Sequence, residues 1–378
     1  MGQRTFWRWL TATTAALCLA ATQGWALVRF DDGNDQIFVN TSLSVAYDSN
    51  IFASNGGSGD VLTTTSLSLE YTRRAGYIGI NASAAWNLGR FDSNTGQDFS
   101  NPALHLELVK GSGRTTGTLT LDASRNSSAD TTVNMRTDSW NYLAGLNWKY
   151  PVIDRYSLSG GFNYGLTTYE DPAPGIYNLT TYGSSLDLFY AYTSARDLIA
   201  GYAVQFSDSG AGTRSIDHSF TVGVSGKILA KVNGTVRAGY QLRQQQATGE
   251  TFGSWTASAS STWNLNRRVS FTATLSKAFT TSAADSTVDN LAANLDMQYA
   301  LRARWSLYAG IGGGKNDFLS GSDAGRRDYY LTWSTGVNYS LNDHFKASLT
   351  YSYFQNWSNR SSGVFDRQSV TLNLSSRW

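Results

Sequence analysis

Apolar and polar residues alternate strictly in segment after segment along this chain, each about ten residues long. In one such segment Val39, Leu43, Val45 and Tyr47 alternate with small or polar residues. A period of two places successive side chains on opposite faces of a β-strand, whereas a helix repeats every 3.6 residues. Each segment therefore predicts a strand with one apolar face and one polar face.

About 18 segments of this kind can be counted, an even number in the range of outer-membrane barrels. Composition does not shift between them, so residues 27–378 are expected to form one domain. The predicted fold is all-β, a single antiparallel transmembrane β-barrel of about 18 strands. The expected spans are 37–48, 61–72, 77–90, 102–110, 115–125, 136–150, 156–169, 177–193, 198–207, 217–228, 234–244, 254–265, 269–279, 288–302, 305–315, 327–341, 345–355 and 365–378.

Connection lengths alternate as well. Short turns at 73–76, 111–114, 194–197 and 342–344 lie between longer loops such as 49–60 and 316–326. This asymmetry is typical of a membrane barrel with short periplasmic turns and longer extracellular loops, and it predicts both termini in the periplasm. No loop exceeds about 15 residues, so none is expected to fold inside as a constriction. Narrowing is instead expected from Phe189, Tyr308 and Tyr330, whose rings can equally pack over glycines.

Aromatic residues of the apolar register gather toward the two ends of the predicted strands, as interfacial girdles would. A soluble β-sandwich or an autotransporter-like surface protein is the competing interpretation, but it needs neither girdles nor alternating loop lengths. The set near the short turns is Tyr71, Trp148, Tyr150, Tyr156, Tyr192, Trp263, Tyr299, Trp305 and Tyr339. The set near the loops is Tyr47, Trp86, Trp140, Tyr164, Phe206, Trp255, Trp333 and Tyr351.

Composition excludes several other classes of protein. Charged residues make up 15% and mean hydropathy is −0.30, which argues against a bundle of transmembrane helices. With 12 Trp, 21 Tyr and 17 Phe the chain is too aromatic to be disordered. A net charge of +2 gives no reason to expect nucleic acid as a partner. One Cys and three separated His predict no metal site and no cofactor.

Residues 1–26 have the pattern of a signal peptide. Arg4 and Arg8 precede an apolar segment, 10–21, and residues 24–26 offer small residues for cleavage near Ala26. We expect export through the Sec pathway, with loss of Cys18 and a mature chain that starts near Leu27.

The last strand predicts a C-terminal assembly signal, because its alternation ends in a terminal aromatic that the barrel insertion machinery reads. The proposed signal residues are Val370, Leu372, Leu374 and Trp378, with Trp where Phe is more usual. The simpler alternative is a strand that happens to end the chain.

The polar register predicts a lumen lined mostly by Ser, Thr, Asn and Gly. A barrel of this size encloses water, so scattered charges there are expected to be hydrated wall residues without partners. Neither sign dominates, and strong ion selectivity is not expected. The lumen-facing candidates are Glu70, His105, Glu107, Asp122, Asp187, Arg237, Arg243, Asp296, Lys346 and Arg367.

Catalysis is not predicted. A nucleophile or general base needs positioned partners, and His105, His218 and His344 lie on different predicted elements without them. We therefore predict no catalytic residues and expect that the protein is not an enzyme.

The segment Val45-Ala46-Tyr47-Asp48-Ser49-Asn50-Ile51-Phe52 resembles the opening of the putative beta-barrel porin type 2 family. The resemblance extends over the mature chain as about 18 strands that end at Trp378. It implies an integral protein of the outer membrane of a Gram-negative type bacterium, and several members are linked to exopolysaccharide export. The family defines no catalytic residues.

Three functions follow as hypotheses: a conduit for exported polysaccharide, a general diffusion porin for small solutes, or a structural or adhesive surface barrel. Short loops with few apolar residues count against the third. The expected partners are outer-membrane lipids and the insertion machinery, and for export also periplasmic polysaccharide-export proteins.

Overall fold

A computed structural model describes residues 28–30, 34–74 and 76–378. The expected leader and its cleavage near Ala26 lie outside these residues. The strands are β1 (Val28–Phe30), β2 (Asp35–Asp48), β3 (Asp60–Arg73), β4 (Gly79–Phe91), β5 (Phe99–Lys110), β6 (Thr116–Asp130), β7 (Met135–Ile153), β8 (Tyr156–Glu170), β9 (Leu179–Thr193), β10 (Arg196–Ser209), β11 (Arg214–Leu229), β12 (Val232–Gln245), β13 (Thr251–Asn264), β14 (Val269–Thr281), β15 (Thr287–Arg302), β16 (Trp305–Phe318), β17 (Arg327–Ser340), β18 (Phe345–Ser358) and β19 (Phe365–Arg377). Two short 3-10 turns, η2 (Thr95–Gln97) and η3 (Ser361–Gly363), lie in loops.

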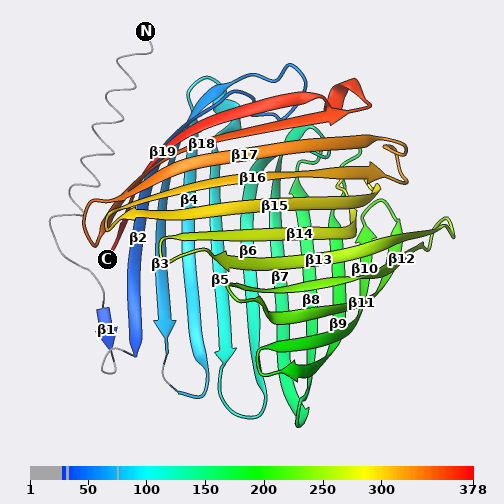
Figure 1. Ribbon diagram of the computed structural model, residues 1–378. Coiled ribbons are helices and arrows are strands. Elements are labelled where there is room, and N and C mark those ends of the chain that lie inside the picture. Colours follow the sequence, from blue (N-terminus) through cyan, green and yellow to red (C-terminus); the bar gives the residue numbers. More distant parts are fainter. Residues whose placement is uncertain (1–27, 31–33, 75) are drawn as a thin grey trace.

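The strands close into a barrel. From β2 onward each strand pairs antiparallel with the next, and β19 returns to pair with β2, as in Leu374 opposite Leu43. In Figure 1 the later strands β14–β19 cross in front of β2–β7 at a steep angle as the sheet curls round. The predicted closed antiparallel barrel of 18 strands is confirmed. β1 is an addition that the sequence did not predict, a short strand that pairs with β2 outside the 18.

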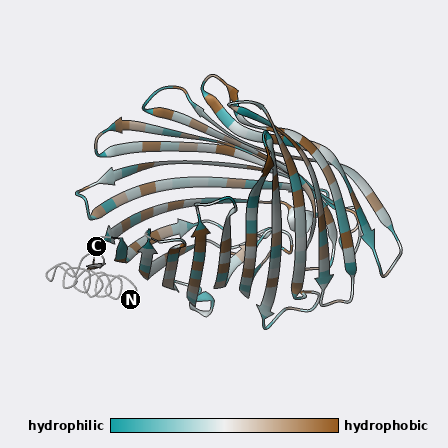
Figure 2. Ribbon diagram, turned by 90° about the horizontal axis from the view of Figure 1, so that it is seen from below, coloured by the Kyte–Doolittle hydropathy of each residue, from teal (hydrophilic) through white to brown (hydrophobic). Residues whose placement is uncertain are grey.

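The outer face of the wall is apolar. Leu67, Val222 and Leu372 are 55%, 68% and 57% exposed, and each alternates with polar neighbours on its strand. Figure 2 shows the same alternation as brown and pale or teal segments along the strands. So much exposed apolar surface favours burial in lipid, where barrel closure also satisfies the backbone hydrogen bonds. In the described residues no helix is long and apolar enough to cross a membrane.

The connections fit the expected asymmetry only in part. The loops 49–59, 171–178 and 319–326 are long, and the connections 154–155 and 303–304 at the other end are tight. At the loop end, however, 131–134 and 210–213 are as short as turns. The expectation of a long loop at every extracellular connection is therefore wrong, because some hairpins stay paired almost to their tips.

The wall separates at two places near the loop end. Pairing of β5 with β6 stops at Ala103 opposite Ser124, whereas β6 and β7 remain paired up to Asp130 and Met135. Likewise β13 and β14 stop at Ala257 and Lys277, but β14 and β15 continue to Thr281 and Thr287. Each time the end of a hairpin separates from the wall on one side, while its other side stays paired at its base, as Asp138 with Glu170 and Val288 with Phe318. We call these ends the first inward hairpin (residues 125–138) and the second inward hairpin (residues 278–288).

Candidate functional site

The structure places all ten lumen-facing candidates on the register opposite the exposed apolar side chains. Asp296, for example, lies between Leu295, which is 45% exposed on the outer face, and Met297. The candidates come from eight strands around the barrel. They are Glu70, His105, Glu107, Asp122, Asp187, Arg237, Arg243, Asp296, Lys346 and Arg367.

Most of these charges have partners, so the expectation of unpartnered hydrated charges is wrong. The ion pairs join Arg367 to Asp48 at 2.5 Å, Arg237 to Asp187 at 2.7 Å, Arg243 to Asp217 at 2.6 Å, Arg377 to Glu70 at 3.1 Å and His105 to Asp122 at 2.6 Å. Glu107 accepts a hydrogen bond from Asn81 at 2.7 Å. Adjacent strands or strands up to three positions away in the sheet supply these partners, and one sequence does not give the register that brings them together. Asp296 and Lys346 have no ion pair among the described residues.

Arg243 holds the second inward hairpin against the wall. Its guanidinium donates to both carboxylate oxygens of Asp217 at 2.6 Å, and Nη1 donates to the carbonyl of Thr280 at 2.9 Å. Phe279 lies under it at 5.5 Å, and Gln241 accepts a bond from the Phe279 amide at 3.2 Å. Gln241 and Arg243 face the lumen, because they alternate with the exposed Tyr240. The hairpin therefore lies inside the barrel, on the lumen side of β12.

The tip of the second inward hairpin is packed among other loops. Ser286 is fully buried and Ala283 is 3% exposed. The carbonyl of Ala283 accepts from the Tyr177 amide at 2.9 Å, and Asp285 accepts from the hydroxyl groups of Ser209 and Thr213. These contacts come from the β8–β9 loop and the β10–β11 hairpin, so the tip is fixed on several sides.

The first inward hairpin packs on the inner wall in the same way. Arg136 lies over the lumen-facing rings of Phe91 and Phe99, at 4.9 and 5.6 Å from their centroids. Arg125 reaches across the separation from β5 and donates to Asn101 at 3.1 Å, while Glu170 binds the same guanidinium at 2.6 Å. A basic side chain thus fills the space that the missing β5–β6 pairing leaves.

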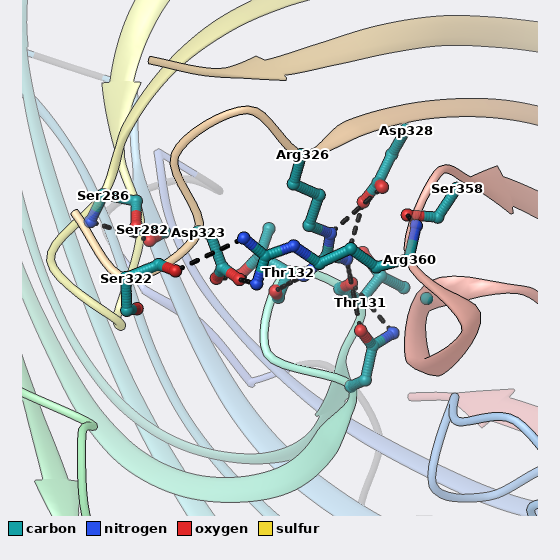
Figure 3. Close-up of polar contacts among 12 residues, drawn as sticks. Thr131, Thr132, Ser282, Ser286, Ser322, Asp323, Arg326, Asp328, Ser358 and Arg360 are labelled. Atoms are coloured by element: carbon teal, nitrogen blue, oxygen red, sulfur yellow. Dashed lines mark hydrogen bonds and ion pairs between the residues drawn. The ribbon is translucent and has the colours of Figure 1, made fainter. Parts of the chain in front are cut away.

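Arg326 joins the two sides of the mouth. It belongs to the β16–β17 loop, is 4% exposed, and pairs with Asp328 at 2.6 Å. Its other nitrogen donates to the carbonyl of Thr132 at 2.8 Å, and Asn134 accepts at 3.1 Å, both at the tip of the first inward hairpin. Figure 3 shows this guanidinium between Asp328 and Thr131–Thr132, with Arg360 beside Asp323. Since β6–β7 and β16–β17 lie on opposite sides of the barrel, the contact crosses the opening.

The prediction that no loop folds inside is therefore wrong: two hairpins and the loop 319–326 narrow the mouth at the loop end of the barrel. Most of the two inward hairpins is polar in sequence and is predicted as connection between the strands at 115–125, 136–150, 269–279 and 288–302, so nothing marks these residues as paired ends that fold into the lumen. Two of the three rings expected to narrow the lumen cover glycines instead. A Cβ on Gly336 would meet the ring of Tyr308 at 2.3 Å, and one on Gly314 would meet Tyr330 at 2.4 Å. Phe189 lies beneath Lys149 at 4.6 Å.

The histidines have more partners than expected. His105 pairs with Asp122, so the expectation that it lacks a partner is wrong. Ser83 lies opposite His105 on β4 and is the nearest candidate for a nucleophile, but no hydrogen bond joins it to this pair. His218 bonds the Tyr202 hydroxyl at 2.8 Å. His344 stacks on Trp378 at 4.2 Å. In the part of the chain that the structure describes, no three His, Cys, Asp or Glu side chains gather as metal ligands.

The proposed assembly signal lies on the closing strand. Val370 and Leu372 project from the outer face, 44% and 57% exposed, and Leu374 follows in the same register. The backbone of Trp378 exchanges two hydrogen bonds with Val39, at 3.0 and 3.1 Å. The last residue thus completes the junction between the two ends of the sheet.

A closed antiparallel barrel with an apolar outer face and a polar lumen defines a porin-like membrane channel. Comparison with family models gives the family: the chain belongs to the family described as Putative beta-barrel porin 2, whose model matches residues 157–298 and 218–377. It is accordingly an outer-membrane β-barrel channel protein.

Solved porins share the fold at low sequence identity. The crystal structure of Pseudomonas aeruginosa OpdK with vanillate matches with a TM-score of 0.50 and 9% identity, over 90% of this chain and 99% of that chain. Pseudomonas aeruginosa OccK2 (OpdF) matches with a TM-score of 0.50 and 11% identity, over 91% of this chain and 97% of that chain. No curated protein matches the sequence.

Proposed function

We propose that this protein is a passive channel for small polar solutes, with a size limit set at the extracellular mouth by the two inward hairpins. The observation that carries the proposal is the buried Arg243, which binds Asp217 and Thr280 together and so holds the second hairpin inside the lumen. Paired charges and hydroxyl groups along the wall provide a hydrated path without one dominant sign. One structurally similar porin, OpdK, was crystallised with the small molecule vanillate.

Export of polysaccharide, the function implied by the family resemblance, is the competing proposal. A polymer chain threads through an opening that stays wide along its whole length, whereas here Arg326 crosses the mouth to Thr132. Export therefore requires that this contact break and the hairpins swing away. Passage of small solutes requires no such movement, and for that reason we favour it.

We further propose that the protein has no enzymatic activity, since in the described residues no serine, threonine or cysteine is hydrogen-bonded to the His105–Asp122 pair. We also propose that residues 1–26 direct Sec export, that the strand ending at Trp378 is read by the insertion machinery, and that lipids cover the outer face. The contacts of Trp378 with Val39 and His344 support a role of the last residue in closing the barrel.

Liposome swelling tests the channel proposal directly. Purified protein is reconstituted and the liposomes are challenged with arabinose, then with a disaccharide, a trisaccharide and a tetrasaccharide. We expect swelling rates to fall steeply with solute size, because the inward hairpins limit the opening. The proposal is overturned if arabinose does not enter, or if the tetrasaccharide enters as quickly as arabinose.

A deletion strain separates the two proposals in the cell. Surface polysaccharide is measured in the strain that lacks the gene and in the complemented strain. Unchanged polymer supports solute passage. Polymer lost from the surface and retained in the periplasm supports export instead.

A further inference from the structure

Lys149 stands out among the basic residues of the lumen wall. It lies on β7, alternates with the exposed Leu146 and Tyr142 of the outer face, and is itself exposed to the lumen. No carboxylate of the described residues lies within ion-pair distance of its ammonium group. Most basic side chains within the barrel strands have such a partner, so a lumen-facing lysine without one, near the short-turn end of β7, retains a positive charge available to a solute.

An aromatic ring lies directly below this ammonium group. The Lys149 Nζ is 4.6 Å from the centroid of Phe189, and the guanidinium of Arg237 lies 6.0 Å from the centroid of the same ring. In the sheet order, the strand of Phe189 lies between the strands of Lys149 and Arg237. Lys149, Phe189 and Arg237 come from β7, β9 and β12, which places one apolar ring beside two cations. We call this group the Lys149–Phe189–Arg237 cradle.

The wall is shaped to hold Arg237 in this position. Its side chain crosses Gly223 on the neighbouring strand. Any larger residue there would place its Cβ only 2.9 Å from Arg237 Cγ, which is too close. Its Nη1 donates to Asp187 at 2.7 Å, and Asp187 in turn covers Gly201, where a Cβ would meet its carboxylate at 2.2 Å. Two glycines therefore let the ion pair lie flat against the wall. Among the residues described, no acceptor is bound to the Nε and Nη2 of Arg237, which remain able to bind a carboxylate.

The charge balance of the cradle is positive. Lys149 and Arg237 contribute two cations and Asp187 one anion, while Ser159, the cross-strand partner of both Lys149 and Asp187, adds a hydroxyl group. We infer that the cradle is a binding site for small organic anions, in which a carboxylate binds Lys149 and Arg237 and an apolar part contacts Phe189. The inference rests on the proposed channel function and names the class of solute that the channel favours.

The probe is benzoate, with neutral benzamide of the same shape as its control. Benzoate is added to single channels carrying KCl current in planar bilayers, and the concentration that halves the current is measured. We expect Lys149→Gln to raise this concentration about threefold, in line with one solvent-accessible ion pair, and Lys149→Arg to restore it. Benzamide should have little effect on any variant.

Lys346→Gln is the matched control, because Lys346 is also exposed and faces the lumen. Within the described part of the chain it has neither an ion pair nor an aromatic ring under its ammonium group. It should leave the benzoate response unchanged. The inference is overturned if both glutamine variants weaken benzoate equally, since that would reflect the general field of the lumen, or if neither does.

Failure of the channel itself gives a different result. If the protein carries no KCl current, the proposed function falls, and binding is then read by saturation-transfer difference NMR of benzoate on the detergent-solubilised protein. A signal that Lys149→Gln reduces and Lys346→Gln does not would support the cradle independently. A current that flows without any benzoate effect refutes the cradle and leaves the channel standing.

Discussion

Removal of the Arg243 guanidinium should release the second inward hairpin. Arg243 is fully buried, donates to both oxygens of Asp217 at 2.6 Å, and donates to the Thr280 carbonyl at 2.9 Å. In Arg243→Ala the carboxylate of Asp217, 13% exposed, loses its partner and the hairpin loses its anchor. Breaking a buried pair by removing one partner costs about 3–5 kcal/mol.

That cost should appear as displacement of the hairpin rather than unfolding of the barrel. The pairing of β14 with β13 already ends at Lys277, so residues 278–286 can move without breaking wall pairing once the contacts of the tip with Tyr177, Ser209 and Thr213 give way. Thr287 and Val288 stay paired with the β16 side. Water then reaches Asp217 and relieves the unpaired charge. A loss of about 3 kcal/mol is roughly a hundredfold change in the population of the inward position, enough to change its average occupancy.

Single-channel conductance in planar bilayers measures the effect, and liposome swelling with the tetrasaccharide measures the new size limit. Arg243→Ala should raise the conductance and admit the larger sugar, while the melting of the barrel changes little. The double variant Arg243→Met, Asp217→Leu is the control, because replacing both charges with apolar residues leaves no buried charge unpaired. It should lie closer to the wild type.

A wild-type conductance and size limit in Arg243→Ala would refute the reasoning, since the hairpin would then hold its place without the anchor. Equal effects in the single and double variants would show that the Thr280 contact alone is responsible.

Three further predictions concern other parts of the barrel. Arg326→Ala should also raise conductance, because it frees the loop 319–326 from Thr132. Arg327→Ala is the control and should leave conductance unchanged, since the Arg327 side chain is 67% exposed. Equal conductances of the two variants would contradict the contact across the mouth. Leu295→Arg should destabilise the barrel by about 2–4 kcal/mol in denaturant unfolding from lipid, but Asp296→Arg on the lumen face should cost little, and similar costs would contradict the assigned faces. Trp378→Ala should reduce the folded fraction of the protein in outer-membrane preparations, because it removes the ring stacked on His344. The folded fraction is measured by heat-modifiable migration in gel electrophoresis, and Ser375→Ala in the same strand is the control.

The number and orientation of the strands could be predicted from the sequence because both are local properties. A period of two specifies a strand and its apolar face, and a chain of such strands can satisfy its backbone in lipid only by closing. Leu67, Leu295 and Leu372 illustrate this, since their outward positions follow from alternation alone. The lumen register of Arg243 and Asp296 follows in the same way.

The partners of those charges could not be predicted, because they depend on register between strands. Asp217 meets Arg243 only because β11 and β12 pair with those residues adjacent, and Asp187 meets Arg237 across two intervening strands. Alternation is unchanged when a strand slides by two residues, so it does not select one partner over another.

The sequence by itself therefore determined a closed membrane barrel with a polar lumen, because that outcome needs only the pattern within each strand. The tertiary structure decided how the mouth is narrowed. Residues 125–138 and 278–288 read mostly as polar connections, yet they form hairpin ends that separate from the wall where pairing stops at Ala103 and Ala257. Their position is fixed by Arg136, Arg243 and Arg326, whose partners lie on other strands or loops and meet them only once the strands have assembled in register.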